Sequence, residues 1–466
     1  MASRTLDAAR PVTRVERLPD AVGPLTVFLV LLMAIPSRLT FAPLGAAGTP
    51  ATVVGVAFAC WYMFTWLNPA APLARGRQPI RLAALLFLCT ILATYLSASR
   101  HAMSTSELNG LDRGPILVVG WLGVILVAAD GIEDLAGLKT LVRRVVAGGT
   151  ALCVFGIIQA TTTFNIAQYI VIPGLSQSAA SYTLVRGDLT RPSVTTIQPL
   201  EFAGVVGVCL PLAIYLARNA EPSLKRRHWL QVAIIGVASV MTTSRTSILD
   251  LIAIGIVLLP AWTKVERRRA YISIVLAGVG LFLTVHGLLG TIKDLFSGAG
   301  SDSSTQSRTD AFSAAGQFIS QNPWFGRGFG TFDPATYFFT DDQYLNSLIE
   351  IGVVGMLVLF ALFVTGWCTA RSARRASANA DIRDLAQCLA AAVAAAAVSF
   401  GTFDALAFPM MAGTTFLLLG CVGAVWRLSR SPAETVAQPV LREPGSGVPG
   451  IESGAAWGSH QQYRDV

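Results

Sequence analysis

Three arginines in polar stretches that border long apolar runs are the residues best suited to chemistry. They are Arg191 in RPSVTTIQPLEF, Arg245 in TTSRTS and Arg308 in SDSSTQSRTD. A guanidinium group binds phosphate oxygens through paired hydrogen bonds and stays charged at any physiological pH. Together, three such groups could hold a diphosphate without a metal ion. The alternative is that each arginine pairs with an acid, as Arg245 could with Asp250, or anchors at lipid headgroups.

Acids near the same stretches could move a proton. Asp341 and Asp342 stand just before an apolar run that begins near Tyr344. Either one could act as a general base if burial raised its pKa, although capping of the following helix is the alternative. Glu350 lies about two helical turns further on, which places it inside the predicted membrane crossing. An acid inside a membrane is a functional candidate by default. Pairing with an arginine is the structural alternative for Glu350.

Few residues could hold a metal or a cofactor. All seven cysteines fall in apolar segments without CxxC spacing, which indicates neither a zinc site nor a disulfide framework. Only four histidines occur in the chain, and no acidic pair recurs at a motif spacing. The segment GRGFG at 326–330 has GxGxG spacing but lacks the flanking strand and helix of a nucleotide-binding loop, so we interpret it as a turn. The sequence therefore predicts no metal site and no cofactor.

The elements that must position these residues are membrane helices. Hydrophobic residues make up 53% of the 466 residues and charged residues only 13%, about half the ~25% of a soluble protein. So little charge cannot cover a soluble surface, which excludes an ordinary cytosolic enzyme. The net charge of +8 does not indicate nucleic-acid binding, because the basic residues lie mainly in short loops between apolar runs.

Apolar runs that approach the length of a bilayer crossing, which takes about 20 residues, occur twelve times. They lie at roughly 23–42, 49–67, 82–98, 114–130, 145–163, 199–217, 229–243, 247–262, 270–290, 344–370, 385–403 and 408–426. With the N-terminus in the cytoplasm, 26 of the 35 Lys and Arg residues fall inside and 9 outside, as the positive-inside rule requires. The sequence predicts a multi-pass protein of the plasma membrane with both termini in the cytoplasm.

This map divides the chain into three parts. A cytoplasmic N-terminal segment at 1–22 precedes a transmembrane helical domain at 23–427. The tail at 428–466 is rich in Gly, Pro and Ser, and we expect it to be cytoplasmic and disordered.

Two predicted outer loops, at 164–198 and 291–343, are long enough to suggest a function. The second contains an amphipathic pattern that predicts a helix at Ser307–Asn322 along the membrane surface. Its apolar face consists of Ala311, Phe312, Ala315, Phe318 and Ile319.

Several of these segments resemble the O-antigen ligase and polysaccharide polymerase superfamily. SRTDAFSAAGQFISQNPWFGRGFGTF at 307–332 and DDQYLNSLIEIGVVG at 341–355 match its pattern of an arginine that begins a helix, a glycine-rich turn and a polar pair before the next crossing. Upstream, RPSVTTIQPLEFAGVVGVCLPLAI at 191–214 and MTTSRTSILDL at 241–251 resemble its other recurring segments. The resemblance spans about residues 190–365 in order, spacing and topology.

The resemblance implies an all-α, GT-C-like membrane protein and a metal-independent glycosyltransferase that works on the outer face. Such enzymes take a glycan from a polyprenyl diphosphate and pass it to an acceptor hydroxyl. By position, Arg191, Arg245 and Arg308 would hold the diphosphate, and Asp341 or Asp342 would be catalytic. Glu350 and Asp250 are secondary candidates.

One departure from the family pattern bears on the reaction. Ligases of this family place a histidine where this chain has Asp341–Asp342, and no histidine occurs between 291 and 355. His286 lies off the motif, and we expect a packing role for it. The missing histidine favours a polymerase of lipid-linked repeat units for a surface polysaccharide, with a chain-length regulator as a candidate partner. It leaves the general base open.

Two alternatives remain at this point. A ligase of the same superfamily would move a finished glycan to a lipid or protein acceptor. A secondary transporter, a flippase or a structural membrane protein would also fit twelve crossings with both ends inside. Transporters hold their key charges near the middle of the membrane, whereas the three arginines are predicted at its outer edge.

Overall fold

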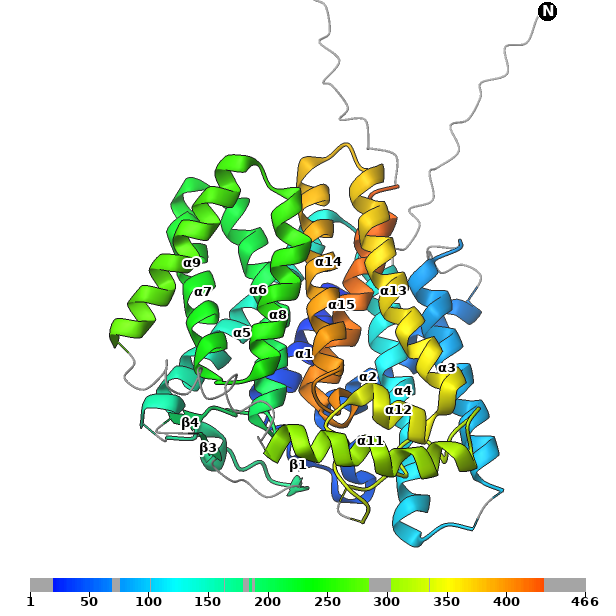
Figure 1. Cartoon of the computed structure of the whole chain (residues 1–466). Helices are drawn as coiled ribbons and strands as arrows, with labels where there is room; N and C mark the ends of the chain where they lie inside the picture. Colours follow the sequence, from blue (N-terminus) through cyan, green and yellow to red (C-terminus); the bar gives the residue numbers. More distant parts are fainter. Residues whose placement is uncertain are drawn as a thin grey trace, which may run out of the picture. The chain divides into compact units, whose positions relative to one another are not determined.

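The computed structural model describes residues 20–68, 76–100, 102–162, 164–178, 184–186, 189–284, 303–334 and 336–430. Most of them form helices that run roughly side by side (Figure 1). The predicted N-terminal segment, the predicted C-terminal tail and His286 fall outside the described residues, apart from a few positions where the two segments join the bundle.

Long helices account for the apolar runs of the sequence. The first half of the chain forms α1 (Val22–Ala34), α2 (Pro50–Leu67), α3 (Pro79–Ala98), α4 (Thr105–Gly131), α5 (Leu135–Thr162) and α6 (Pro199–Arg218). The second half forms α7 (Pro222–Met241), α8 (Arg245–Leu258), α9 (Lys264–Thr284), α11 (Ser303–Gln321), α12 (Gln343–Glu350), α13 (Gly352–Ala376), α14 (Ala380–Phe400) and α15 (Pro409–Leu428). Short 3-10 segments are η1 (Ala42–Gly48), η2 (Ile166–Tyr169), η3 (Leu259–Ala261) and η4 (Ala405–Ala407).

Eight helices of the described chain are long and apolar enough to cross a membrane. They are α2, α3, α4, α5, α6, α13, α14 and α15. Helix α1 is apolar but has 13 residues, α8 has 14 residues, and α7 and α9 each carry a basic cluster in their first turns. The chain is thus a mostly helical multi-pass membrane protein. A helix overlaps each of the twelve predicted runs, but the count of twelve crossings and the GT-C-like likeness stay predictions.

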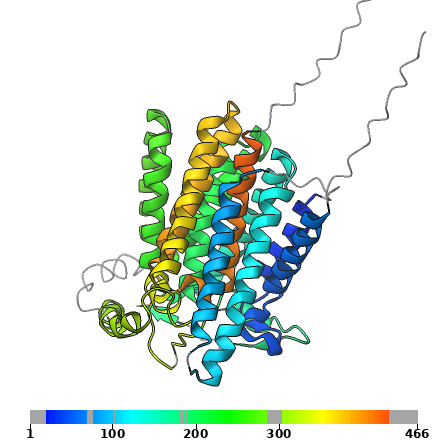
Figure 2. The same ribbon diagram turned by 90° about the vertical axis from the view of Figure 1, so that its right-hand side faces the viewer.

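The helix ends define two sides of the bundle, visible in Figures 1 and 2. We call one side the motif end; it carries the connections at 35–49 and 401–408, the short strands and α11. We call the other side the basic end; it carries the connections at 219–221 and 377–379 and both ends of the described chain. In the predicted orientation the motif end faces outward and the basic end faces the cytoplasm.

The first helix is shorter than the predicted crossing at 23–42. It ends at Ala34, and Ile35 is extended with φ −86° and ψ 127°. The residue before a proline avoids the helical region, and Pro36 follows Ile35. Residues 35–49 therefore form a connection at the motif end instead of the end of a helix.

Two small antiparallel sheets at the motif end modify the all-α prediction. β1 (Leu39–Thr40) pairs with β2 (Ser176–Gln177), with Leu39 opposite Gln177. β3 (Leu184–Arg186) pairs with β4 (Leu189–Arg191), with Leu184 opposite Arg191. The long connection between α5 and α6 is therefore fastened to the segment after α1 by the first sheet, and the second sheet ends at Arg191.

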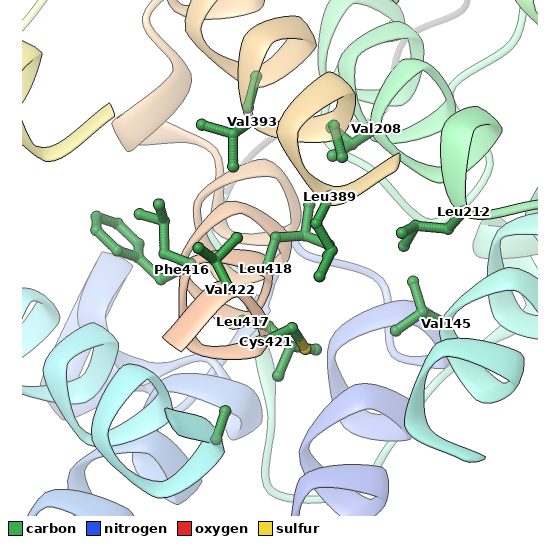
Figure 3. Packing of buried hydrophobic residues seen from close by; sticks show 14 of the residues in the cluster. Val145, Val208, Leu212, Leu389, Val393, Phe416, Leu417, Leu418, Cys421 and Val422 are labelled. Atoms are coloured by element: carbon green, nitrogen blue, oxygen red, sulfur yellow. The ribbon is translucent and has the colours of Figure 1, made fainter. Parts of the chain in front are cut away.

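Helices α6 and α15 form the centre of the core. In each, 89% of the membrane-length window is buried, against 17% for α2. Figure 3 shows Leu417, Leu418 and Cys421 of α15 packed among side chains of α5, α6 and α14. The run of small residues at 390–397 of α14 lets neighbouring helices approach closely. This packed centre gives the connections at the motif end a rigid support.

Candidate active site

Three segments far apart in the sequence attach to residues 401–411, here called the connection at 401–411, which comprise the link between α14 and α15 and the first three residues of α15. From α8, the Thr246 hydroxyl donates to Thr402 Oγ1 at 2.8 Å. From the stretch before α12, the Thr340 hydroxyl donates to Asp404 Oδ1 at 2.6 Å. From α6, Glu201 Oε1 accepts the Met410 N–H at 2.7 Å. These contacts gather the segments that contain Arg245, Asp341–Asp342 and the end of the Arg191 motif around one connection.

The Arg191 motif is held by hydrogen bonds to two helices, α5 and α1, each between a side chain and a backbone group. The Gln159 Oε1 of α5 accepts the N–H groups of Ser193 and Val194 at 3.1 and 2.8 Å. The Thr195 hydroxyl donates to the Met33 carbonyl of α1 at 2.8 Å. Val194 has φ 51°, an unfavourable conformation for a β-branched residue that persists only where surrounding contacts enforce it. Arg191 is half-buried at the start of this motif.

Arg245 is the first residue of α8 and is half-buried. Before it, Ser244 caps the helix by accepting the Thr246 N–H at 3.3 Å, and Thr243 has φ 45°. The TTSRTS segment is therefore a tight turn between α7 and α8. Arg245 thus begins a helix, where the first-turn N–H groups and the helix dipole also favour an anion.

Arg308 lies in α11, which crosses the motif end (Figure 1); its side chain is outside what the structure describes. The predicted helix at Ser307–Asn322 corresponds to this element. Its buried face, with Ala311 and Ala315, packs against Leu345 and Ile349 of α12. We predicted that the apolar face of this helix lies on the membrane surface. Most of that face instead packs against other residues of the protein. Phe312, with 57% exposure, projects away from that contact.

Asp342 caps α12, as one of the two sequence interpretations proposed. Its Oδ1 accepts the N–H groups of Tyr344 and Leu345 at 2.8 and 3.4 Å. Asp341 is half-exposed and has φ 49°, which is uncommon for a residue other than glycine and frequent at functional sites. Capping does not exclude Asp342, so the catalytic role of either acid stays a prediction.

Asp404 is a site residue that the sequence analysis missed. Its Oδ1 accepts the Thr340 hydroxyl and, at 3.3 Å, the Asp342 N–H. Burial raises the pKa of Asp404 to about 6, and the negative charges of Asp341 and Asp342 add to the rise, while the Thr340 hydrogen bond opposes it. The signal that could have revealed it is its place as the lone acid in a short connection on the predicted outer side.

Glu350 is buried, but it does not pair with an arginine in the described chain. Its Oε1 accepts the N–H groups of Gly330 and Phe332 at 3.0 and 3.1 Å. The GRGFG segment is a turn, as predicted: Gly326, Gly328 and Gly330 all have positive φ. A Cβ at Gly326 would lie 2.3 Å from the Glu350 backbone. Glu350 therefore supports the glycine-rich turn through Oε1, and a part for it in chemistry stays a prediction.

Arg327 fastens this turn to two helices. Its Nη2 donates to Glu107 Oε1 of α4 and to the Tyr337 hydroxyl, both at 2.8 Å. The guanidinium group also lies over the rings of Tyr337 and of Phe318 in α11, at 4.8 and 5.1 Å from their centroids. Arg327 thus fixes the position of the helix that contains Arg308, a role the sequence analysis did not find.

Asp250 lies deeper in the bundle than the other candidates. It is fully buried, and its Oδ2 accepts the Ser399 hydroxyl of α14 at 2.9 Å. A Cβ at Gly207 of α6 would come within 2.6 Å of Asp250 Oδ2, so the glycine makes room for the carboxyl group. Asp250 thus contacts α6 and α14 from α8, and its part in the site stays a prediction.

Within the described residues no three His, Cys, Asp or Glu side chains gather as metal ligands would. The fold and the site define a multi-pass membrane protein with a polar site at one end of its helices. Residues 230–360 match the family model described as O-antigen ligase, so this part of the chain is similar to O-antigen ligase-related proteins. No curated protein matches the chain. The matched region contains Arg245, Arg308 and Glu350 but not Arg191 or Asp404.

Proposed function

We propose that this protein polymerises polyprenyl-diphosphate-linked oligosaccharide units into a surface polysaccharide on the outer face of the membrane. The coarser class, an O-antigen ligase or polymerase-type enzyme of lipid-linked glycans, follows from the family match. The observation that supports the finer statement is the convergence of the Arg245, Asp341 and Arg191 segments on the connection at 401–411.

In the proposed reaction, Arg191, Arg245 and Arg308 bind the diphosphate of the donor. An acceptor hydroxyl attacks the anomeric carbon, a new C–O bond forms, and the bond from that carbon to the diphosphate oxygen breaks. The arginines stabilise the negative charge that develops on the leaving polyprenyl diphosphate. No metal ion is needed for this step, because the guanidinium groups supply the positive charge.

Asp404 acts as the general base in this proposal and takes the proton of the acceptor hydroxyl. Both of its described hydrogen bonds are accepted by Oδ1, which leaves Oδ2 for an acceptor. A pKa of about 6 suits a general base that works near neutral pH. Asp341, whose charge helps to raise that pKa, is the second candidate, and Asp342, which also caps α12 through Oδ1, is the third.

Helix α11 and the turn at 326–332 cover part of the motif end. Exclusion of water would protect the activated donor from hydrolysis, and the clamp by Arg327 would keep this cover in place. A ligase is the second candidate function, because the family description itself names one. The absence of a histidine between 291 and 355 favours the polymerase.

A transfer assay tests the proposal. Purified full-length protein in detergent is given a polyprenyl-diphosphate oligosaccharide with EDTA present, and products are separated by size. A ladder of lengthening lipid-linked chains is expected. A single product on an added lipid or peptide acceptor would instead identify a ligase, and loss of all transfer in EDTA would contradict the metal-independent mechanism.

A further inference from the structure

A basic pocket lies at the basic end, on the side of the bundle opposite the proposed active site. It is formed by the last turns of α13. Its lining residues are Trp367, Cys368, Arg371, Ser372, Arg375 and Ala376. The pocket therefore combines two guanidinium groups with one large aromatic ring.

Hydrogen bonds fix the polar walls of this pocket. The Arg371 Nη1 donates to Gln387 Oε1 of α14 at 2.7 Å, and the Gln387 Nε2 donates to the Val257 carbonyl of α8 at 2.6 Å. From the turn that follows α15, the Arg430 Nη2 donates to Ser372 Oγ at 3.3 Å. Arginines from two segments are thus held beside one pocket before any ligand arrives.

Within the described residues, these arginines have no acidic partner. In the part of the chain that the structure describes, no carboxylate forms an ion pair with Arg371, Arg375 or Arg430. Two acids at the same end form ion pairs with other basic residues: Asp381 pairs with Lys139, and Asp384 lies 3.6 Å from Arg218. An anion in the pocket would meet arginines that have no competing carboxylate.

An apolar stripe on α13 leads from the membrane-spanning part of the helix to the pocket. Phe360, Val364 and Trp367 follow at spacings of four and three residues, which places them on one helix face, and Arg371 continues that face. Their exposures are 51%, 44% and 41%. The indole of Trp367 lies against Arg371, with 5.8 Å from the guanidinium carbon to the ring centroid. Tryptophan is typical of the membrane–water interface.

We propose that this pocket binds the phosphate of an anionic phospholipid from the leaflet at the basic end. The guanidinium groups contact the headgroup phosphate, and the acyl chains lie along the exposed face of α13. Basic pockets between helices at a membrane surface bind anionic headgroups in this way. The apolar stripe distinguishes a lipid from a free phosphate ion, which would gain nothing from Phe360 and Val364. This site is independent of the proposed polymerase activity.

Native mass spectrometry of the full-length protein with cardiolipin, phosphatidylglycerol or phosphatidylcholine tests this inference. We expect bound cardiolipin and phosphatidylglycerol, and about a tenfold loss of both in Arg371→Gln/Arg375→Gln. The control Arg226→Gln/Arg227→Gln removes two exposed charges from the same end without touching the pocket, and it should bind as the wild type does.

Arg375→Gln alone keeps the test valid if the Arg371 change disturbs the fold, because Arg375 makes no described hydrogen bond. It should bind several-fold less anionic lipid at an unchanged melting temperature in lipid-free detergent. Displacement of the lipid by millimolar inorganic phosphate would overturn the lipid assignment in favour of a free anion. Equal binding of phosphatidylcholine, or equal loss in the control variant, would overturn the site.

Discussion

The two ends of the bundle use their carboxylates differently. At the basic end, acids pair with cations: Asp130 lies 2.8 Å from Arg81, and Glu266 lies 3.0 Å from Arg218. At the motif end, Glu201 accepts the Met410 N–H from α15 at 2.7 Å, and Glu350 accepts those of Gly330 and Phe332. Ion pairs therefore join helices at one end, and carboxylate–backbone hydrogen bonds shape connections at the other.

This difference explains how polar segments can keep a defined shape at the motif end. A hydrogen bond to a backbone N–H is directional and fixes a turn, whereas an ion pair tolerates more movement. One exception is the ion pair of Glu107 with Arg327 at the motif end, where Glu107 also accepts the Tyr337 hydroxyl, at 2.8 and 2.5 Å, and joins the loop to α4. The motif end is thus built to hold side chains in place.

The largest effect should come from removing an arginine of the proposed diphosphate site. Arg245→Ala should lower transfer by about a hundredfold or more, because a preorganised charge on the leaving group is lost. Arg245→Lys should recover little, since an ammonium group lacks the paired hydrogen bonds of guanidinium. Initial rates from the transfer assay measure both.

Arg226→Ala is the control for this prediction, because it removes an exposed arginine at the basic end. Full activity is expected. If Arg245→Ala and Arg226→Ala had equal rates, the two ends would not differ in function and the diphosphate site would be wrongly placed.

The second-largest expected effect is the loss of transfer at low pH, when Asp404 becomes protonated. With the pKa of Asp404 at about 6, the base is ionised above that pH and protonated below it. The rate should therefore be level above pH 7 and fall by about tenfold per pH unit well below 6. Initial rates at saturating donor should give one acid limb near that value. A flat profile between pH 5 and 8 would exclude Asp404 as the base.

Glu350→Ala should have a smaller effect on activity and a large one on stability. It leaves the buried Phe332 N–H without its acceptor, which costs about 1–3 kcal/mol of unfolding free energy, and it also removes the acceptor of the more exposed Gly330 N–H. Glu350→Gln keeps a carbonyl oxygen in place and should lose less. Thermal unfolding in detergent compares the variants. Equal melting temperatures for wild type and Glu350→Ala would refute the structural role.

The smallest effect should come from Asp342, if it only caps α12. Asp342→Asn can still accept the Tyr344 N–H and should retain nearly full transfer, while Asp342→Ala should lose about 1 kcal/mol of stability. A hundredfold loss of transfer in Asp342→Asn, with an unchanged melting temperature, would show that the carboxylate itself takes part in the reaction.

Much of the helical fold could be predicted from apolar length, because a helix overlaps every predicted run. The early end of α1 was missed, since apolar length outweighed the local effect of Pro36. The surface helix and the glycine-rich turn followed from local patterns of spacing.

The site was harder to predict because its contacts are long-range. Asp404 lies more than 150 residues from Arg245 in the sequence, and only the packing of α8 against α14 brings Thr246 to Thr402. Glu350 was correctly singled out as an unusual buried acid, but its partners are backbone groups, which a sequence pattern does not display. The roles of Asp342 and Arg327 likewise depend on which neighbours the fold supplies.

Asp404→Asn in the transfer assay tests the central claim, that the connection at 401–411 forms the transfer site, most directly. The asparagine oxygen can still accept the Thr340 hydroxyl and the Asp342 N–H, so the fold should be kept, which a melting curve checks. Asp384→Asn changes an acid at the basic end and is the matched control. We predict a full ladder for wild type and Asp384→Asn and none for Asp404→Asn. A full ladder from a folded Asp404→Asn variant would contradict this assignment.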